Sequence, residues 1–317
     1  MKKYAFGVDI GGTTVKIGLF DREGAILDKW EIPTNKENHA EKVLPDIASS
    51  LISKLAEKEI AREDIEGIGV GSPGSITADG YLRSAVNIGW EELDLTGELT
   101  RLTGFPTKAS NDANVAAFGE MWMGAGKGCD NILMVTLGTG VGGGVIVNGE
   151  ILSGATGSGG EIGHIHVEDN ENEPCNCKNC GCLEQYGSAT GIARLARKRL
   201  AKDNEKSSLR DIEPDKLSAK DVFDALKAGD KLAREVGEQF ADYLGKGLGI
   251  IASVTDPERI VIGGGVSRAG EIIIELVEPK YRKYAYPPCG KAQVVLATLG
   301  NDAGIYGAAG LILRKTK

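Results

Sequence analysis

Short apolar runs bounded by glycine alternate along this chain with stretches in which apolar residues recur every three or four positions. The helical spacing is clearest at residues 43–55 and 232–251, the second ending at Asp256-Pro257. Strand-like runs follow both, IEGIGVGSPG at 65–74 and RIVIG at 259–263, and a further helix is expected from near Ser267. Strands that alternate with helices predict an α/β fold.

The pattern also contains an internal repeat. Residues 8–27, VDIGGTTVKIGLFDREGAIL, and residues 135–152, VTLGTGVGGGVIVNGEIL, both indicate a strand, a Gly/Thr-rich turn, a second strand and a short polar turn. Two unrelated hairpins that need glycine would give similar letters. We favour a duplicated domain, because strand, turn and strand match in order. Each turn could then offer backbone N–H groups to a phosphate chain, on either side of a cleft.

Composition narrows the class of protein. The 317 residues are 41% hydrophobic and carry a formal net charge of −8, which argues against a nucleic-acid-binding surface. No run approaches the length of a membrane span, and MKKYAFGVDIGG is too short for a signal peptide. We therefore expect a cytoplasmic protein without a membrane partner. Thiols stay reduced there, so the cysteines indicate metal binding or redox chemistry rather than disulfides.

One glycine motif is misleading. Residues 138–143, GTGVGG, match the dinucleotide-binding pattern G-x-G-x-x-G. That motif requires a helix directly after it, whereas VIVNGEIL reads as a strand. We therefore do not expect nicotinamide chemistry.

Three polar residues suggest chemistry. Asp9 lies in an apolar strand just before a glycine turn, and the matching position of the repeat is Thr136. Asp9 either caps its own turn or faces Mg²⁺ beside a phosphate, and its presence in only one half favours the second reading. Asn111 and Asp112 begin a helix, yet two adjacent residues of this kind exceed what one cap needs. Such residues suit the paired hydroxyls of a sugar, and a carboxylate could accept the hydroxyl proton.

Ligand-type side chains concentrate between His164 and Cys182, HIHVEDNENEPCNCKNCGC. This stretch holds two of the three histidines and four of the six cysteines of the chain. Glu161 and Glu184 bracket it. Six candidates compete for four positions, because structural zinc is nearly always four-coordinate.

Taken together, these motifs closely resemble the sugar kinases of the ROK (repressor, ORF, kinase) family, and among them the bacterial glucokinases. The resemblance covers essentially the whole chain, and the cysteine run beside GGEIGH is its most specific part. It implies the actin-like ATPase (ribonuclease H-like) fold, with two duplicated α/β domains flanking a cleft. We expect a smaller domain at residues 1–117 plus a C-terminal helix at 301–317, and a larger, zinc-carrying domain at 118–300.

The resemblance also implies the roles of individual residues. Asp112 would be the catalytic base. The residues expected at ATP and Mg²⁺ are Asp9, Gly11, Gly12, Thr13, Gly138, Thr139, Gly140, Gly263, Gly264 and Gly265. Those expected at the sugar are Gly74, Asn111, Asp112, Glu161, His164 and Glu184. The implied zinc ligands are His164, Cys175, Cys177 and Cys182, with His166 and Cys180 as spares.

A site filled by three thiolates and one imidazole leaves no open position for catalysis. The zinc would therefore be structural and would hold neighbouring residues in place. His164 could bind it through one ring nitrogen and present the other N–H to a sugar hydroxyl.

The implied reaction is ATP-dependent phosphorylation of glucose at its 6-hydroxyl. The alternatives are a kinase for mannose, fructose, N-acetylglucosamine or N-acetylmannosamine, and a non-catalytic sugar sensor. Repressors of the family carry a helix-turn-helix domain before the sugar fold, and a first strand from about Tyr4 leaves no room for one. Members are commonly homodimers, so we expect a homodimer.

Overall fold

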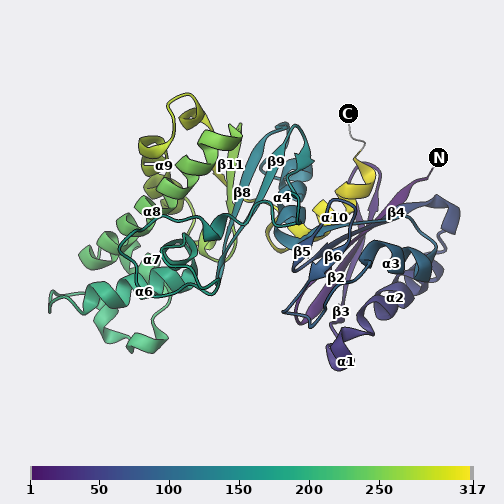
Figure 1. Ribbon diagram of the computed structural model, residues 1–317, viewed down its shortest axis with the longest axis horizontal. Helices are drawn as coiled ribbons and strands as arrows, with labels where there is room; N and C mark the ends of the chain where they lie inside the picture. The colour runs from purple at the N-terminus through teal and green to yellow at the C-terminus, as the bar shows by residue number, and fades with distance from the viewer. Residues whose placement is uncertain (1, 315–317) are drawn as a thin grey trace. The chain divides into compact units, whose positions relative to one another are not determined.

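The computed structural model describes residues 2–314, which form two compact units (Figure 1). Unit 1 contains the chain up to Asp130, residues 144–160 and the chain from Thr298 onward, and unit 2 contains residues 131–143 and 161–297. The expected boundary at residue 117 falls inside helix α4, Asp112–Met123. α4 stays in unit 1 because it packs against α10, Ala303–Leu313. Residues 315–317 of the predicted C-terminal helix lie outside the described residues.

Unit 1 is built on a five-stranded sheet of order β3-β2-β1-β4-β7. Its strands are β1 Tyr4–Ile10, β2 Thr14–Asp21, β3 Ile26–Pro33, β4 Ile65–Ser72 and β7 Thr107–Asn111. The first three are antiparallel neighbours, whereas β4 runs parallel to β1 and β7 runs parallel to β4. Two short strands, β5 Ser75–Ile76 and β6 Leu82–Ser84, form a separate ribbon.

The second five-stranded sheet repeats this topology, with the order β10-β9-β8-β11-β12. Its strands are β8 Ile132–Leu137, β9 Val141–Val147, β10 Glu150–Ile151, β11 Arg259–Gly263 and β12 Gln293–Leu296. Again β10 is antiparallel to β9, while β11 lies parallel to both β8 and β12. The predicted duplication is therefore confirmed at the level of topology.

Helices cover both faces of the first sheet (Figure 1). Phe6, Val8 and Ile10 point to one face, where they share a core with α2, Val43–Glu57, and α3, Leu95–Thr103. The alternate residues face α10, because successive side chains of a strand point in opposite directions. A side chain at Gly7 or Gly69 would overlap the α10 backbone, so these glycines let the helix lie directly on β1 and β4. A short helix, α1 Glu37–Ala40, precedes α2.

The helices of unit 2 pack mainly on one another. They are α5 Glu184–Gly187, α6 Ala189–Leu200, α7 Ala219–Lys227, α8 Lys231–Thr255 and α9 Ile272–Tyr284. The predicted long helix is α8, and it ends at Asp256 in the left-handed conformation. The helix expected near Ser267 is a 3₁₀ turn, Val266–Ala269, and α9 begins only after Gly270, whose φ is +84°.

Residues 201–220 are charged and have no helical or strand period, which predicts an exposed connection, and this prediction is partly wrong. It contains two 3₁₀ turns and buries Leu209, which is 1% exposed, and α7 starts within it. Within residues 2–314, no helix is long and apolar enough to cross a membrane.

Candidate active site

Four of the expected site residues lie along one edge of the first sheet. Parallel strands end at the same edge, and here β1, β4 and β7 are neighbours. The register pairs Asp9 with Gly71 and Ser72 with Asn111. Gly74 follows Ser72 by two residues, and Asp112 follows Asn111. The fold of unit 1 therefore brings together residues that are far apart in the sequence.

Asn111 and Asp112 have different roles at the start of α4. The Asn111 side-chain oxygen caps the helix by accepting the backbone N–H groups of Ala113 (3.0 Å) and Asn114 (3.3 Å). Its amide donates to the carbonyl oxygen of Gly74 at 3.0 Å. Gly74 has a φ of +100°, and a side chain there would meet the backbone of Ser84. Because Asn111 supplies the cap, Asp112 is left as a carboxylate at a helix N-terminus.

Asp9 and Asp112 influence each other electrostatically. The pKa of Asp9 is raised to about 6, mainly by burial and also by the negative charge of Asp112, while Lys16 acts in the opposite sense. Burial likewise raises the pKa of Asp112, while the hydrogen bond from the Ala113 backbone N–H lowers it. Two half-buried carboxylates that interact electrostatically would favour a bound cation.

The turn after Asp9 is tightly closed. The Gly11 N–H donates to the Thr14 carbonyl at 3.0 Å, and a Cβ at Gly11 would come within 2.7 Å of that oxygen. Thr34 holds the turn from the side, because its backbone N–H donates to Thr13 O at 2.9 Å. The segment Gly11–Thr13 thus presents a short fixed backbone next to the Asp9 carboxylate.

In unit 2, the corresponding turn lies between β8 and β9. The Gly138 N–H donates to the Gly140 carbonyl at 3.0 Å. The start of α6 supports this turn, since the Ala189 N–H donates to Gly138 O at 2.8 Å and the Thr190 hydroxyl donates to Thr139 O at 2.8 Å. No motif in the sequence indicates that α6 supports this turn.

Gly263 to Gly265 end the neighbouring strand β11, whose register pairs Gly263 with Thr136 of β8. Gly264 has a φ of +83°, and a Cβ there would lie 2.6 Å from the Leu137 backbone. Gly265 opens onto a cavity of about 430 Å³ within unit 2. The residues that line it are Ala189, Ser218, Ala219, Lys220, Phe223, Asp224, Lys227, Gly265, Val266, Arg268 and Ala269. Sequence reasoning missed all of these except Gly265, because α7 is distant in the chain and carries no motif.

The four expected zinc ligands converge in unit 2. The ligand atoms of His164, Cys175, Cys177 and Cys182 all lie within 4.8 Å of one another. The Cys177 and Cys182 sulfurs are 3.5 Å apart, and Cys175 Sγ is 3.9 Å from His164 Nδ1. Tetrahedral zinc with Zn–S bonds of about 2.3 Å requires ligand separations of about 3.8 Å, so this donor set fits the metal.

His166 is not a member of this group. Its Nδ1 lies 3.0 Å from the Cys180 carbonyl oxygen, and its Nε2 lies 2.8 Å from Asp169 Oδ1. The Asp169 carboxylate raises the pKa of His166. Both ring nitrogens are thus engaged elsewhere.

The acids that bracket the zinc group are positioned differently. Glu161 immediately precedes the 3₁₀ turn Ile162–His164, and its carbonyl accepts the His164 N–H at 3.2 Å. Glu184 begins α5, and its Oε2 accepts the Val141 backbone N–H at 3.0 Å. Its other oxygen lies 3.7 Å from Cys175 Sγ. Glu184 therefore connects the zinc group to the turn that contains Gly140.

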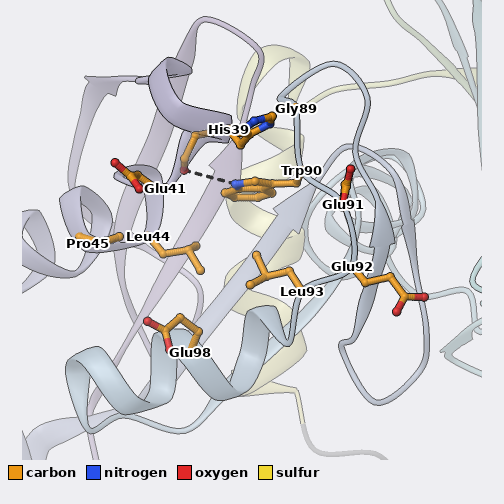
Figure 2. Close-up of a pocket in the computed structure, with 11 residues that line it drawn as sticks. His39, Glu41, Leu44, Pro45, Gly89, Trp90, Glu91, Glu92, Leu93 and Glu98 are labelled. Atoms are coloured by element: carbon orange, nitrogen blue, oxygen red, sulfur yellow. Dashed lines mark hydrogen bonds between the residues drawn. The ribbon is translucent and has the colours of Figure 1, made fainter.

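A further cavity, of about 440 Å³, lies in unit 1 (Figure 2). Its wall includes Leu44, Trp90, Leu93 and several glutamates, and one side is the segment around His39. The Trp90 indole donates to the Ala40 carbonyl at 3.3 Å. None of the residues expected from the sequence lines this cavity.

Comparison with known proteins agrees with the resemblance. Residues 5–315 match the model of the ROK family. The chain belongs to the ROK family. A glucokinase of Halalkalibacterium halodurans is 45% identical over 98% of this chain and 95% of its own length. A glucokinase of Thermotoga maritima is 40% identical over 96% of each chain.

A solved structure extends the comparison. The ROK family glucokinase from Streptomyces griseus, determined in complex with glucose and AMPPNP, has a TM-score of 0.73 at 33% identity. The match covers 98% of this chain and 99% of that one. The predicted family and the actin-like ATPase fold are thereby confirmed.

Proposed function

We propose that this protein is an ATP-dependent kinase that transfers the γ-phosphoryl group to the 6-hydroxyl of glucose. The observation that carries the proposal is Asp112, a half-buried carboxylate beside the Asn111 helix cap, at the strand edge that also holds Asp9. Full-length similarity to glucokinases, one of them solved with glucose and AMPPNP, supports the choice of substrates.

Asp112 acts as the general base. It accepts the proton of the sugar hydroxyl as that oxygen attacks the γ-phosphorus, and the bond to the β-phosphate oxygen breaks to release ADP. Burial raises the pKa of the Asp112 carboxyl group. The carboxylate therefore accepts a proton more readily than an exposed one would. Asn111 and Gly74 hold sugar hydroxyls near it.

Backbone turns and one acid receive the phosphates. In unit 1, Gly11, Gly12 and Thr13 supply donors, and Asp9 would hold Mg²⁺, which would offset the charge of the phosphates. In unit 2, Gly138, Thr139 and Gly140 form the second phosphate turn. The cavity beside Gly265 receives the adenosine, for which its apolar lining with Phe223 is suited.

The zinc group is structural. His164, Cys175, Cys177 and Cys182 would hold one Zn²⁺, which would fix the His164 imidazole and the nearby Glu184 as sugar-binding groups together with Glu161.

The regiochemistry offers a direct test. ADP formation should depend on glucose, and the product should be glucose 6-phosphate by ³¹P NMR. 6-Deoxyglucose, which lacks the accepting hydroxyl, should bind and inhibit but give no ADP above the blank. Turnover with 6-deoxyglucose at the rate for glucose would contradict transfer to the 6-hydroxyl.

A further inference from the structure

The segment after β3 is attached to the Gly11–Thr13 turn at its start. The Thr34 backbone N–H donates to Thr13 O at 2.9 Å, and the Thr34 hydroxyl donates to Gly11 O at 2.7 Å. These two bonds clasp the turn from one side. The residues that directly follow Thr34 therefore start beside the Gly11–Thr13 turn.

The same segment is held at its other end. The Ala40 carbonyl accepts the Trp90 indole N–H, the dashed line in Figure 2. Asn38, His39 and Ala40 have φ values of 48°, 55° and 57°. Left-handed conformations of non-glycine residues persist only where surrounding contacts enforce them. Residues 34–40 thus form a segment fixed at both ends.

Lys36 lies within this segment, and its ammonium group is next to the turn. A Cβ built on Gly12 would lie 3.4 Å from Lys36 Nζ. Within residues 2–314, Lys36 Nζ has no hydrogen-bond or ion-pair partner. Lys16, the cation that acts on Asp9, instead donates to the carbonyl of Asn301 at 3.2 Å.

We propose that Lys36 is a phosphate-binding residue, whose ammonium group donates charge-assisted hydrogen bonds to the terminal phosphate of the nucleotide at the Gly11–Thr13 turn. The inference rests on the proposed kinase function. The turn offers uncharged N–H donors beside the carboxylates Asp9 and Asp112, which repel a triphosphate. An ammonium group at Gly12 offsets that repulsion and stabilises charge on the transferred group.

The test compares Lys36→Ala and Lys36→Arg with Lys42→Ala, which removes an exposed lysine six positions further along. Lys36→Ala should lower kcat/KM for MgATP by about tenfold to a hundredfold, the range for a lost charged hydrogen bond. Calorimetry should show weakened binding of MgAMPPNP and unchanged binding of AMP, which lacks the terminal phosphate. Lys36→Arg should recover most of the loss, and Lys42→Ala should match the wild type.

Two other outcomes overturn the inference and differ from each other. If the wild type phosphorylates glucose and Lys36→Ala equals Lys42→Ala in kcat/KM and MgAMPPNP affinity, Lys36 does not bind phosphate and the kinase proposal stands. If Lys36→Ala weakens AMP and MgAMPPNP equally, its effect is structural. A wild type that neither binds MgAMPPNP nor turns over would overturn the proposed function and this inference together.

Discussion

Asn111 and Asp112 are neighbours that share the Ala113 backbone N–H, and Asn111 makes further contacts, with Asn114 and Gly74. Asn111 satisfies backbone N–H groups at the start of α4 and the carbonyl of Gly74. The carboxylate of Asp112 bonds locally to the Ala113 N–H at 2.8 Å. An amide can cap and donate at once, whereas a carboxylate can accept a proton. This division of roles underlies the assignment of Asp112 as the base.

Asp112→Asn should lower kcat by about 10²- to 10⁴-fold, because the amide keeps the shape and loses the proton acceptor. Glucose affinity, measured by calorimetry without nucleotide, should stay within about threefold of the wild type. Asp46→Asn, which alters an exposed acid in the first turn of α2, is the matched control and should leave both values unchanged. Turnover of Asp112→Asn within a few-fold of the wild type would remove Asp112 from the base role.

Asp9→Asn should stabilise the metal-free protein near neutral pH. The pKa of Asp9 is raised from 3.8 to about 6, so between these values the folded state keeps a proton that the unfolded state has lost. Wild-type stability therefore falls as pH rises through that window. Removing the buried charge should add up to about 3 kcal/mol to the free energy of unfolding near neutral pH, and little below pH ~4.

Urea unfolding at several pH values in a chelator measures this difference. A variant that is less stable than the wild type near neutral pH would show that the Asp9 carboxylate is favourably paired in the folded state. The same variant should lose turnover with MgATP, because the amide is a poor magnesium ligand.

At this scale, the sequence identified the charged residues but not their partners. An acid in an apolar strand, as at Asp9, is visible in the letters alone because burial of a charge is costly. That Asn111 rather than Asp112 caps α4 could not be read from the sequence, since both are good caps. Which one accepts the helix N–H groups depends on the backbone angles at the end of β7.

At the scale of elements, the zinc group stands out because its segment, residues 165–183, has almost no regular structure.

Elemental analysis should find about one zinc per chain, and Cys177→Ser should lose it. Cys180→Ser should retain the metal, because Cys180 is not one of the four converging ligands and contacts His166 only through its carbonyl oxygen. Glucose affinity should fall about 10- to 100-fold when zinc is lost. Normal glucose binding by metal-free protein would contradict the bracing role.

Glu120 joins α4 to the point where the chain re-enters unit 1. Its side chain is fully buried and accepts the backbone N–H groups of Thr298 (3.0 Å), Leu299 (2.8 Å) and Ala125 (2.8 Å). Glu120→Ala should lower the free energy of unfolding by about 3–5 kcal/mol, since several part-buried donors lose their acceptor. Glu150→Ala removes an exposed acid of the same unit and should cost less than about 0.5 kcal/mol. Equal free energies of unfolding for the two variants, measured in urea, would contradict this role of Glu120.

Element types followed well from hydrophobic spacing, and their exact ends did not. The helical spacing of apolar residues in α8 extends over many turns and predicts the helix clearly. Near Ser267, by contrast, Gly270 interrupts the pattern, and α9 begins only after it. Glu120 attracted no attention in the sequence, because a single acid on a helix is usually exposed. Its burial depends on backbone N–H groups almost 180 residues further along the chain.

For the molecule as a whole, the duplicated order of the two sheets is the strongest agreement between sequence and structure. Both five-stranded sheets arrange three antiparallel strands beside two parallel ones. The repeated hairpins at residues 8–27 and 135–152 predicted this, because each begins a sheet. The segment 144–160 could not be assigned to unit 1 from the sequence, since the boundary between the units falls within β9.

The central claim is that this molecule is a glucose-specific kinase, and its most direct test is ADP release with MgATP across a sugar panel. The panel contains glucose, mannose, fructose, N-acetylglucosamine, N-acetylmannosamine and a blank without sugar, with kcat/KM measured for each on zinc-loaded protein. We predict a kcat/KM for glucose at least about tenfold above every other sugar, over a low blank. A preference for an N-acetyl sugar would contradict the substrate, and sugar-independent or absent ADP release would contradict the kinase.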